Sequence, residues 1–300
     1  MKDSVKEVPI ANSLEETFNK LKKEGYQFPD FSSAETINCV TDYAGDRECD
    51  DHYVYSFIYY DYKKSAEFER LITDLRNKEP EWKDSSFIEY KKLTKDKVRR
   101  RLLPELLNIA NTLQGIIIVF YVDKKIKSFF AEKQGQVSNT LKVAGFGDWK
   151  PQIAEKLLEV LLIQSFFTSK FVSTKHKYFW YSDRDAINDE GRSRIAFVGK
   201  LLGHFLDSFE VYPAFTGYGT NLEDDNYFGD VMSIADLCSG ATLEFYEEQI
   251  DADLVKVSSN EVLEWFAVDS PNLKKINLRL RLNDDGTQTL SIIEYYLKDK

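Results

Sequence analysis

The chain has 300 residues, of which 43% are hydrophobic and 30% charged, with only 14 glycines and 7 prolines. This composition predicts one large globular domain with small additions, and it excludes a disordered or fibrous chain. The three cysteines, Cys39, Cys49 and Cys238, lack the spacing of a disulfide framework or a structural zinc site, so we expect a cytoplasmic protein.

The longest apolar run, residues 116–122, is too short for a transmembrane helix, which needs about 20 apolar residues, and we expect no membrane partner. The N-terminal residues also lack the apolar core of a signal peptide. The formal net charge of −10 does not attract nucleic acid. A nucleic-acid function therefore depends on a local basic patch, or on cations bound at an acidic site.

Residues 1–36 are predicted to form an N-terminal helical extension. Ser13 and Glu16 fit a capping box, in which side chains satisfy the first free backbone N–H groups of a helix. Apolar residues then recur at helical spacing, and Gly25 ends the helix. We expect this helix to pack onto the core.

The central part of the chain, residues 37–250, alternates between strand and helix patterns. We predict strands at 36–42, 52–61, 86–90, 115–123, 177–183 and 210–215, and helices at 65–76, 95–113, 151–171, 192–208 and 230–248. A polar turn joins the first two strands, which predicts an antiparallel pair. The uninterrupted apolar run at 115–123 is typical of a strand buried on both faces. This order predicts an α/β fold with a mixed sheet flanked by helices.

Residues 251–300 are predicted to form a small C-terminal accessory unit. A short helix at 260–267 precedes two strands that are joined by a hairpin turn at 283–286. Apolar residues at 276–282 alternate with polar ones, which predicts one solvent-exposed face.

Acidic residues stand out near the ends of the predicted strands and in the last helix, namely Asp42, Glu89, Asp123, Asp183 and Asp236. Strand ends at one edge of an α/β sheet converge on a common crevice. Carboxylates gathered there repel one another unless cations neutralise them, and their hard oxygens suit Mg²⁺ or Mn²⁺. We therefore predict a site for two divalent ions about 3.5–4 Å apart, which could activate a water and stabilise the leaving oxygen of a phosphodiester.

Each acid also has a structural interpretation. An aspartate at a strand end is commonly a turn former or a helix cap, and Glu89 could point to water. Asp236 lies among small residues in a helix that we expect to be partly buried, where it needs a partner such as an arginine or a cation. Gly240, one helical turn later, shares the face of Asp236 and would let the helix approach the site closely.

Five short segments surround these acids. They are Thr41-Asp42-Tyr43-Ala44-Gly45-Asp46 at the start, then residues 87–93, 118–124 and 181–184, and Ser233-Ile234-Ala235-Asp236-Leu237-Cys238-Ser239-Gly240 at the end. In their order along the chain, these segments resemble the motifs of a ribonuclease-H-like family, the domain of unknown function 3800 family. Tyr43 and Ala44 stand where the family has Glu and Ser, which removes one acid near the predicted site.

The resemblance spans roughly residues 37–250. It implies an RNase-H-like fold and a two-metal nuclease site whose catalytic residues and metal ligands are Asp42, Glu89, Asp183 and Asp236. It leaves the third ligand open. The order of elements in ribonuclease H favours Asp123, whereas the family motif favours Asp183. We predict Asp183 and keep Asp123 as an alternative metal ligand.

Basic residues are concentrated directly after Glu89. The predicted nucleic-acid-binding residues are Lys91, Lys92, Lys95, Arg99 and Arg100, which would hold phosphates beside an acidic site. A solvated helix surface is the alternative for this cluster. The tyrosines at 53, 55, 59 and 90 could stack on bases, although strand tyrosines are more often core residues.

The sequence thus predicts a metal-dependent nuclease, or a related phosphodiester hydrolase, that acts on DNA or RNA. The alternative is a non-catalytic RNase-H-like module that binds a partner protein or nucleic acid. Either function is compatible with a homodimer or with a complex with a partner protein.

Overall fold

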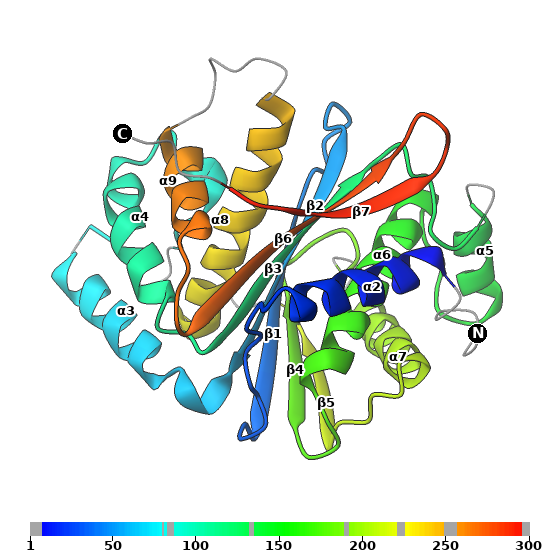
Figure 1. Ribbon diagram of the computed structural model, residues 1–300, viewed down its shortest axis with the longest axis horizontal. Coiled ribbons are helices and arrows are strands. Elements are labelled where there is room, and N and C mark those ends of the chain that lie inside the picture. Colours follow the sequence, from blue (N-terminus) through cyan, green and yellow to red (C-terminus); the bar gives the residue numbers. More distant parts are fainter. Residues whose placement is uncertain are drawn as a thin grey trace.

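The computed structural model describes residues 8–79, 81–82, 87–131, 135–188, 192–220, 226–248 and 257–295. These residues form an α/β fold in which a seven-stranded mixed sheet carries helices on both faces (Figure 1). The strands are β1 Thr36–Ala44, β2 His52–Asp61, β3 Gly115–Asp123, β4 Lys177–Ser182, β5 Phe215–Gly219, β6 Leu273–Leu282 and β7 Gln288–Ile293. The helices are α2 Pro9–Lys23, α3 Ala66–Lys78, α4 Lys97–Ala110, α5 Gln136–Val143, α6 Pro151–Phe171, α7 Arg192–Ser208, α8 Asn226–Glu248 and α9 Val257–Ala267.

The strand order in the sheet is β5-β4-β1-β2-β3-β6-β7. β1, β2 and β3 are successively antiparallel, whereas β4 and β5 continue the sheet in parallel on the other side of β1. β6 pairs in parallel with β3, and β7 is antiparallel to β6. Because β1, β3 and β4 run in the same direction, their carboxyl ends lie at one edge of the sheet, where ligands bind in many α/β proteins.

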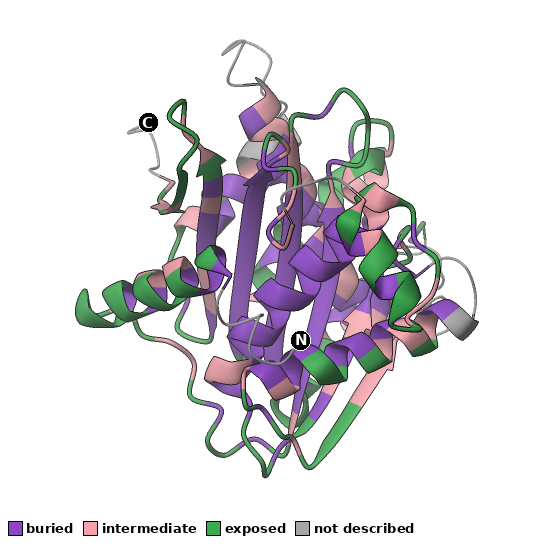
Figure 2. Ribbon diagram, turned by 90° about the vertical axis from the view of Figure 1, so that its right-hand side faces the viewer, coloured by how far each residue is buried: buried purple, intermediate pink, exposed green. Residues whose placement is uncertain are grey.

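Two apolar cores hold the layers together, one on each face of the sheet. Helices α2, α5, α6 and α7 cover one face, and α3, α4, α8 and α9 cover the other (Figure 1). Buried residues fill the central strands and α6, whereas the outer strands β5 and β7 are intermediate or exposed (Figure 2). In the part of the chain that the structure describes, no helix has the length and apolarity needed to cross a membrane.

The N-terminal helix is confirmed, but it begins at Pro9 and not at the predicted capping box. Proline suits the first helical turn because it has no N–H group to leave unpaired. Ser13 is therefore already inside the helix, where its hydroxyl donates to the carbonyl of Pro9 at 3.3 Å. Gly25 follows the helix end with a φ of 88°, as the sequence predicted.

The strand predicted at 86–90 is wrong for the residues that the structure describes. Residues 87–89 have no regular structure, and Tyr90–Lys92 form a single turn of 3₁₀-helix. The backbone N–H of Tyr90 bonds to a side chain of α8 instead of a neighbouring strand. Two smaller differences remain. The strand predicted at 210–215 lies at 215–219 as β5, and helix α5 was not predicted.

The two C-terminal strands form the predicted antiparallel pair, and they also extend the main sheet through the pairing of β6 with β3. The face of β6 predicted to be exposed is exposed only at Arg281 and is covered at Asn277 and Arg279. Asn277 is buried and donates to the hydroxyl of Tyr295, and the guanidinium of Arg279 lies 5.5 Å from the ring of Tyr121 and 5.4 Å from that of Tyr246. An alternating pattern of polar and apolar residues shows that the two faces of a strand differ. It does not show whether the polar face meets water or a layer of aromatic side chains.

We expect Leu278→Ala to lower the free energy of unfolding of the whole described fold by about 2–5 kcal/mol. Leu278 lies in β6 and is 2% exposed in the core shared with β1 to β3 and α6. Denaturant titration followed by circular dichroism and by tryptophan fluorescence should show one shifted transition. Val143→Ala, at an 81% exposed position, is the control and should change stability by less than about 0.5 kcal/mol. A separate unfolding transition at lower denaturant concentration, with the main transition unshifted, would contradict this prediction.

Candidate carboxylate site at one edge of the sheet

A pocket of about 200 Å³ lies at the carboxyl edge of β1 and β4. All four acids that the sequence singled out as catalytic line it, namely Asp42, Glu89, Asp183 and Asp236. They come from β1, from the 87–90 segment, from the end of β4 and from α8. Two basic residues, Lys91 and Arg184, line the same pocket. Folding thus brings together four acids from four separate parts of the sequence.

The sheet register places Asp42 and Asp183 side by side. β1 and β4 are parallel, and Asp183 lies one residue beyond the Thr41–Ser182 pair, level with Asp42. Its backbone N–H donates to the carbonyl of Thr41 at 2.9 Å. Neighbouring strands lie about 4.8 Å apart. Two carboxylates therefore enter the pocket from adjacent positions on the rigid part of the sheet.

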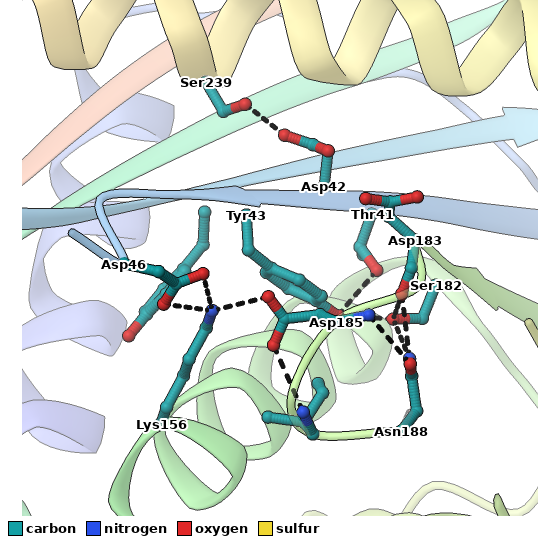
Figure 3. A network of polar contacts seen from close by, with 12 residues as sticks. Thr41, Asp42, Tyr43, Asp46, Lys156, Ser182, Asp183, Asp185, Asn188 and Ser239 are labelled. Atoms are coloured by element: carbon teal, nitrogen blue, oxygen red, sulfur yellow. Dashed lines mark hydrogen bonds and ion pairs between the residues drawn. The ribbon is translucent and has the colours of Figure 1, made fainter. Parts of the chain in front are cut away.

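Helix α8 lies over these two acids and supplies the third. It packs against β1, β2 and β3, and its small residues Ala235 and Ser239 are buried there. The hydroxyl of Ser239 donates to the carboxylate of Asp42 from above the sheet (Figure 3). Asp236, on the preceding turn, enters the pocket beside it.

The 87–90 segment crosses α8 and supplies Glu89. Three contacts hold it in place. The backbone N–H of Tyr90 donates to the carboxylate of Asp236 at 2.5 Å, the hydroxyl of Tyr90 donates to Glu244, and Nε of Arg99 donates to the carbonyl of Phe87 at 2.7 Å. Glu89 is thereby fixed on an irregular segment by bonds to two helices.

Two glycines on α8 make this close crossing possible. A Cβ atom at Gly229 would lie 2.1 Å from the ring of Phe87, and one at Gly240 would lie 2.4 Å from the ring of Tyr90. No side chain fits at such distances without moving the segment. The prediction that Gly240 allows close approach at the site is confirmed, and the element that approaches α8 there is the 87–90 segment.

Burial and mutual repulsion raise the pKa values of three of the four acids. Burial raises the pKa of Asp42 well above its ordinary value, and the charges of Asp236 and Asp183 add to this shift. Burial, followed by repulsion from Asp183 and Glu89, raises the pKa of Asp236 to about 7. Asp183 is exposed, and its pKa is raised by the loss of solvation where it meets the pocket wall, with a further contribution from Asp185. Burial and repulsion between acids together therefore outweigh the nearby basic residues.

Glu89 differs because two lysines neutralise it. Burial acts to raise its pKa, but the paired Lys92 and Lys91 outweigh burial, and the net shift is downward. Lys91 lies 3.3 Å from the Glu89 carboxylate, and Lys92 donates to its other oxygen. Both lysines also line a neighbouring surface hollow of about 540 Å³, the basic hollow, together with Lys95, Asp96, Lys97 and Arg99.

The two predicted nucleic-acid-binding arginines hold loop backbone in this structure. Arg99 bonds to the carbonyl of Phe87 and pairs with Asp96, the N-cap of α4. Arg100 donates to the carbonyls of Leu93 and Thr94, at 2.9 and 2.8 Å from Nη2. The exposed lysines are thus the predicted basic residues best placed to meet a phosphate.

Asp123, the alternative metal ligand, lies away from the pocket. It ends β3, which β2 separates from β1. The registers pair Asp42 with Ser56 and Ser56 with Val119, so Asp123 is four residues further toward the edge. From the spacing of strands and residues, it lies roughly 15 Å from Asp42. Its carboxylate accepts the N–H of Lys125 at 2.8 Å, as a turn former does.

Two of the tyrosines considered for base stacking belong to the core. Tyr55 and Tyr59 are fully buried, and their hydroxyls donate to Glu159 and to the carbonyl of Gln164, each at 2.8 Å. The ring of Tyr90 packs against Gly240. These contacts assign structural roles to all three.

A polar network around the buried Lys156, beneath β1, supports the loop that carries Asp183 (Figure 3). Lys156 of α6, whose side chain is 3% exposed, bonds to Asp46 after β1 at 2.7 Å and to Asp185 at 2.8 Å. Burial alone would lower the pKa of Lys156, but Asp185 and Asp46 outweigh it and raise the pKa. Sequence analysis missed this lysine. Its signal was a charged residue within a helix that is buried along most of its length.

The carboxylates could hold a divalent cation, since their oxygens are the ligands that Mg²⁺ and Mn²⁺ prefer. Within the described residues, however, no three His, Cys, Asp or Glu side chains lie close enough to hold one ion together. Asp42, Asp236 and Glu89 instead accept hydrogen bonds from Ser239, the Tyr90 backbone and Lys92.

No family model matches this chain, and no curated protein or solved structure is significantly similar to it.

Asp236→Asn should make the protein more stable than wild type at neutral and higher pH. The folded-state pKa of about 7 exceeds the ordinary value of 3.8, so the folded protein holds a proton that the unfolded chain releases. The wild type therefore loses stability as pH rises between these values, and the amide removes that loss. At about 1.4 kcal/mol per pKa unit, we expect a gain of about 2–4 kcal/mol near pH 8 and little change near pH 4.

Thermal denaturation across this pH range, without divalent ions, measures the difference. Glu35→Gln is the control, because Glu35 is an exposed acid whose pKa is lowered by Lys177. It should retain the wild-type loss of stability with rising pH. Parallel curves for wild type and Asp236→Asn would contradict the prediction.

Lys156→Met should destabilise the fold by about 3–5 kcal/mol near neutral pH, because it leaves Asp185 buried without its cation. Burial already raises the pKa of Asp185, and removal of Lys156 raises it further. At acidic pH the Asp185 carboxyl is protonated in the variant, so the loss of stability is smaller there. Denaturant titration measures both effects. Lys177→Met removes a similar ion pair from the surface, where both side chains are more than half exposed, and it should cost less than about 1 kcal/mol. Equal losses in the two variants would contradict a structural role for the network.

Proposed function

We propose that this chain is a metal-dependent nuclease, or a related phosphodiester hydrolase, with an RNase-H-like core. The observation that carries the proposal is the shared pocket of Asp42, Glu89, Asp183 and Asp236. Gathering several like charges in one pocket opposes folding, and a fold retains such an arrangement when a cation or a reaction uses it. The raised pKa values of three of these acids agree with a pocket that lacks enough protein cations.

The order and direction of the strands support the RNase-H-like part of the proposal. Three successive antiparallel strands, β1 to β3, are followed by β4 and β5, which extend the sheet in parallel from β1 and are separated by a helix. This is the arrangement expected of such a core. The acids occupy the carboxyl edge of β1 and β4 together with the final helix of residues 37–250.

Mg²⁺ or Mn²⁺ fits the donor set, because the four acids supply hard oxygen ligands on mostly rigid elements. Two such ions, when bound, supply an activated water and stabilisation of the leaving oxygen. The chain itself orients the ligands. Asp42 and Asp183 stand on paired strands, Asp236 on a packed helix, and Glu89 on a segment fixed by its contacts with α8 and Arg99.

The chain also supplies positive charge for the phosphate. Lys91 lines both the carboxylate pocket and the basic hollow, and its ammonium lies 3.3 Å from the carboxylate of Glu89. Burial opposes its charge, but Glu89 and the pocket aspartates outweigh burial and raise its pKa. It remains protonated at neutral pH and can pair with a backbone phosphate whose neighbours lie along Lys92 and Lys95.

A non-catalytic module that binds a partner protein or nucleic acid is the second candidate. It is favoured by the hydrogen bonds that already satisfy Asp42, Asp236 and Glu89, and by the spacing of the acids within the described residues. In this alternative the pocket contributes shape and charge, and no divalent ion is needed.

We expect Mn²⁺ or Mg²⁺ to raise the melting temperature of the wild type by several degrees at saturation, because the ion binds the folded state alone. The same ions should support cleavage of single- or double-stranded DNA or RNA. Asp42→Asn, Asp183→Asn and Asp236→Asn should each lose the thermal shift and at least about 100-fold in cleavage rate, as expected when a group that positions the reacting charge is removed. Gel assays of labelled strands measure the rates.

Asp123→Asn is the matched control, because Asp123 is an acid at a strand end of the same edge but lies outside the pocket. It should keep both the thermal shift and the activity. Nucleic-acid binding without any effect of divalent ions would contradict the nuclease and support the non-catalytic module. Loss of activity in Asp123→Asn equal to that in Asp42→Asn would contradict the assignment of the site.

A further inference from the structure

A row of five aromatic side chains runs from β5 across β4 to the beginning of α8 and to the 3₁₀ turn Tyr62–Lys64 that follows β2. Its members, in spatial order, are Phe215, Phe179, Tyr181, Phe228 and Tyr62. Successive ring centroids lie 5.2, 6.4, 4.0 and 6.3 Å apart, and the two pairs at 6.4 and 6.3 Å are nearly parallel, with interplanar angles of 16° and 9°. We call this set the aromatic row.

The aromatic row is open to solvent at both ends. Phe215 is 51% exposed and Tyr62 is 48% exposed, and the three rings between them are half-buried. Large apolar side chains that stay at the surface in a contiguous row commonly mark a binding surface. Helix α8 packs chiefly on β1, β2 and β3, and its residue Phe228 meets Tyr181 of β4 on the same face of the sheet.

Two glycines of β5 shape the row. Gly217 pairs with Phe179, and Gly219 pairs with Tyr181, on the same face of the sheet. A Cβ atom at Gly217 would lie 2.5 Å from the ring of Phe179, and one at Gly219 would lie 3.7 Å from that of Tyr181. The ring of Phe179 therefore occupies the space that a side chain of β5 would fill. The result is a surface of aromatic rings on an edge strand.

The aromatic row adjoins the carboxylate pocket. Tyr181 precedes Ser182 and Asp183, and Phe228 precedes Gly229, and all three following residues line the pocket. On its other side, Lys91 connects the pocket to the basic hollow. Flat apolar rings, carboxylates and lysines thus follow one another along one surface.

We propose that the aromatic row binds the bases of a single-stranded nucleic acid whose backbone enters the carboxylate pocket. The inference rests on the proposed function and specifies its substrate. An occupant that meets both rings and lysines needs flat π faces and anionic groups at regular intervals, which a nucleic-acid strand has. In a duplex the base faces are stacked inside the helix, so only a single strand presents them to the row.

The test measures binding in EDTA, which prevents metal-dependent cleavage. The probes are an end-labelled oligo(dA) dodecamer, its duplex with oligo(dT), and an abasic dodecamer of the same charge. Wild type should bind the single strand at least about 10-fold more tightly than the abasic strand or the duplex. Tyr62→Ala combined with Phe215→Ala should reduce affinity for oligo(dA) by about 25-fold or more, from about 5-fold per ring, and leave affinity for the abasic strand unchanged.

Tyr212→Ala is the control, since Tyr212 is 48% exposed and lies outside the aromatic row. It should bind all probes like wild type. Because the two substituted rings are exposed, circular dichroism and melting temperature should stay close to those of wild type.

Equal affinity of the wild type for oligo(dA) and the abasic strand would overturn the inference, even if metal-dependent cleavage were observed. A dimer that the double variant converts to a monomer, with no change in oligonucleotide affinity, would also overturn it, because the row would then bind a second copy of the chain. Base-dependent binding that the double variant loses would support the inference, even if no divalent ion supported cleavage and the nuclease proposal failed.

Discussion

Electrostatic repulsion among carboxylates that share one pocket is the constraint that the surrounding elements must offset. Only Asp42 is buried, whereas Asp236 and Glu89 are half-buried and Asp183 is exposed. Asp42 and Asp183 occupy adjacent positions on paired strands, and Asp236 and Glu89 enter the same pocket. Two unit charges about 5 Å apart repel by about 3 kcal/mol at an effective dielectric constant of 20. The sheet and the two cores must therefore hold the acids together against a force that favours their separation. Burial is the main cause of the upward shifts in the pKa values of Asp42 and Asp236, and this repulsion adds to both.

The acids are held from both faces of β1. Above it, α8 and the 87–90 segment interlock through Gly229 and Gly240, and Tyr90 and Ser239 bond to the carboxylates. Beneath it, Lys156 ties the turn after β1 to the loop after β4. Asp185 makes the ion pair with Lys156, so the carboxylate of Asp183, two residues earlier, can line the pocket. In the function proposed above, this support would hold the acids in position for a ligand.

Much of the fold was predictable where local pattern and environment agree. The apolar run at 115–123 became the fully buried β3, and the helix at 151–171 has the predicted bounds. The 87–90 segment was not predictable, although its residues resemble a strand. Ile88 is buried as a strand residue would be, but the backbone around it bonds to α8 and α4. Local composition predicts which residues are buried, but it does not predict which partners the backbone N–H and C=O groups of a segment bond to.

The sequence by itself determined that acids stand at strand ends and in a helix of small residues, since both features follow from the order of residue types along the chain. Only the tertiary structure decided which of these acids meet. Asp123 and Asp183 have the same local setting, yet β2 separates β3 from β1, whereas β4 lies directly beside it. The burial of Lys156 between two aspartates was likewise decided by packing. Strand order and helix packing arise from contacts between distant segments, and no local periodicity encodes those contacts.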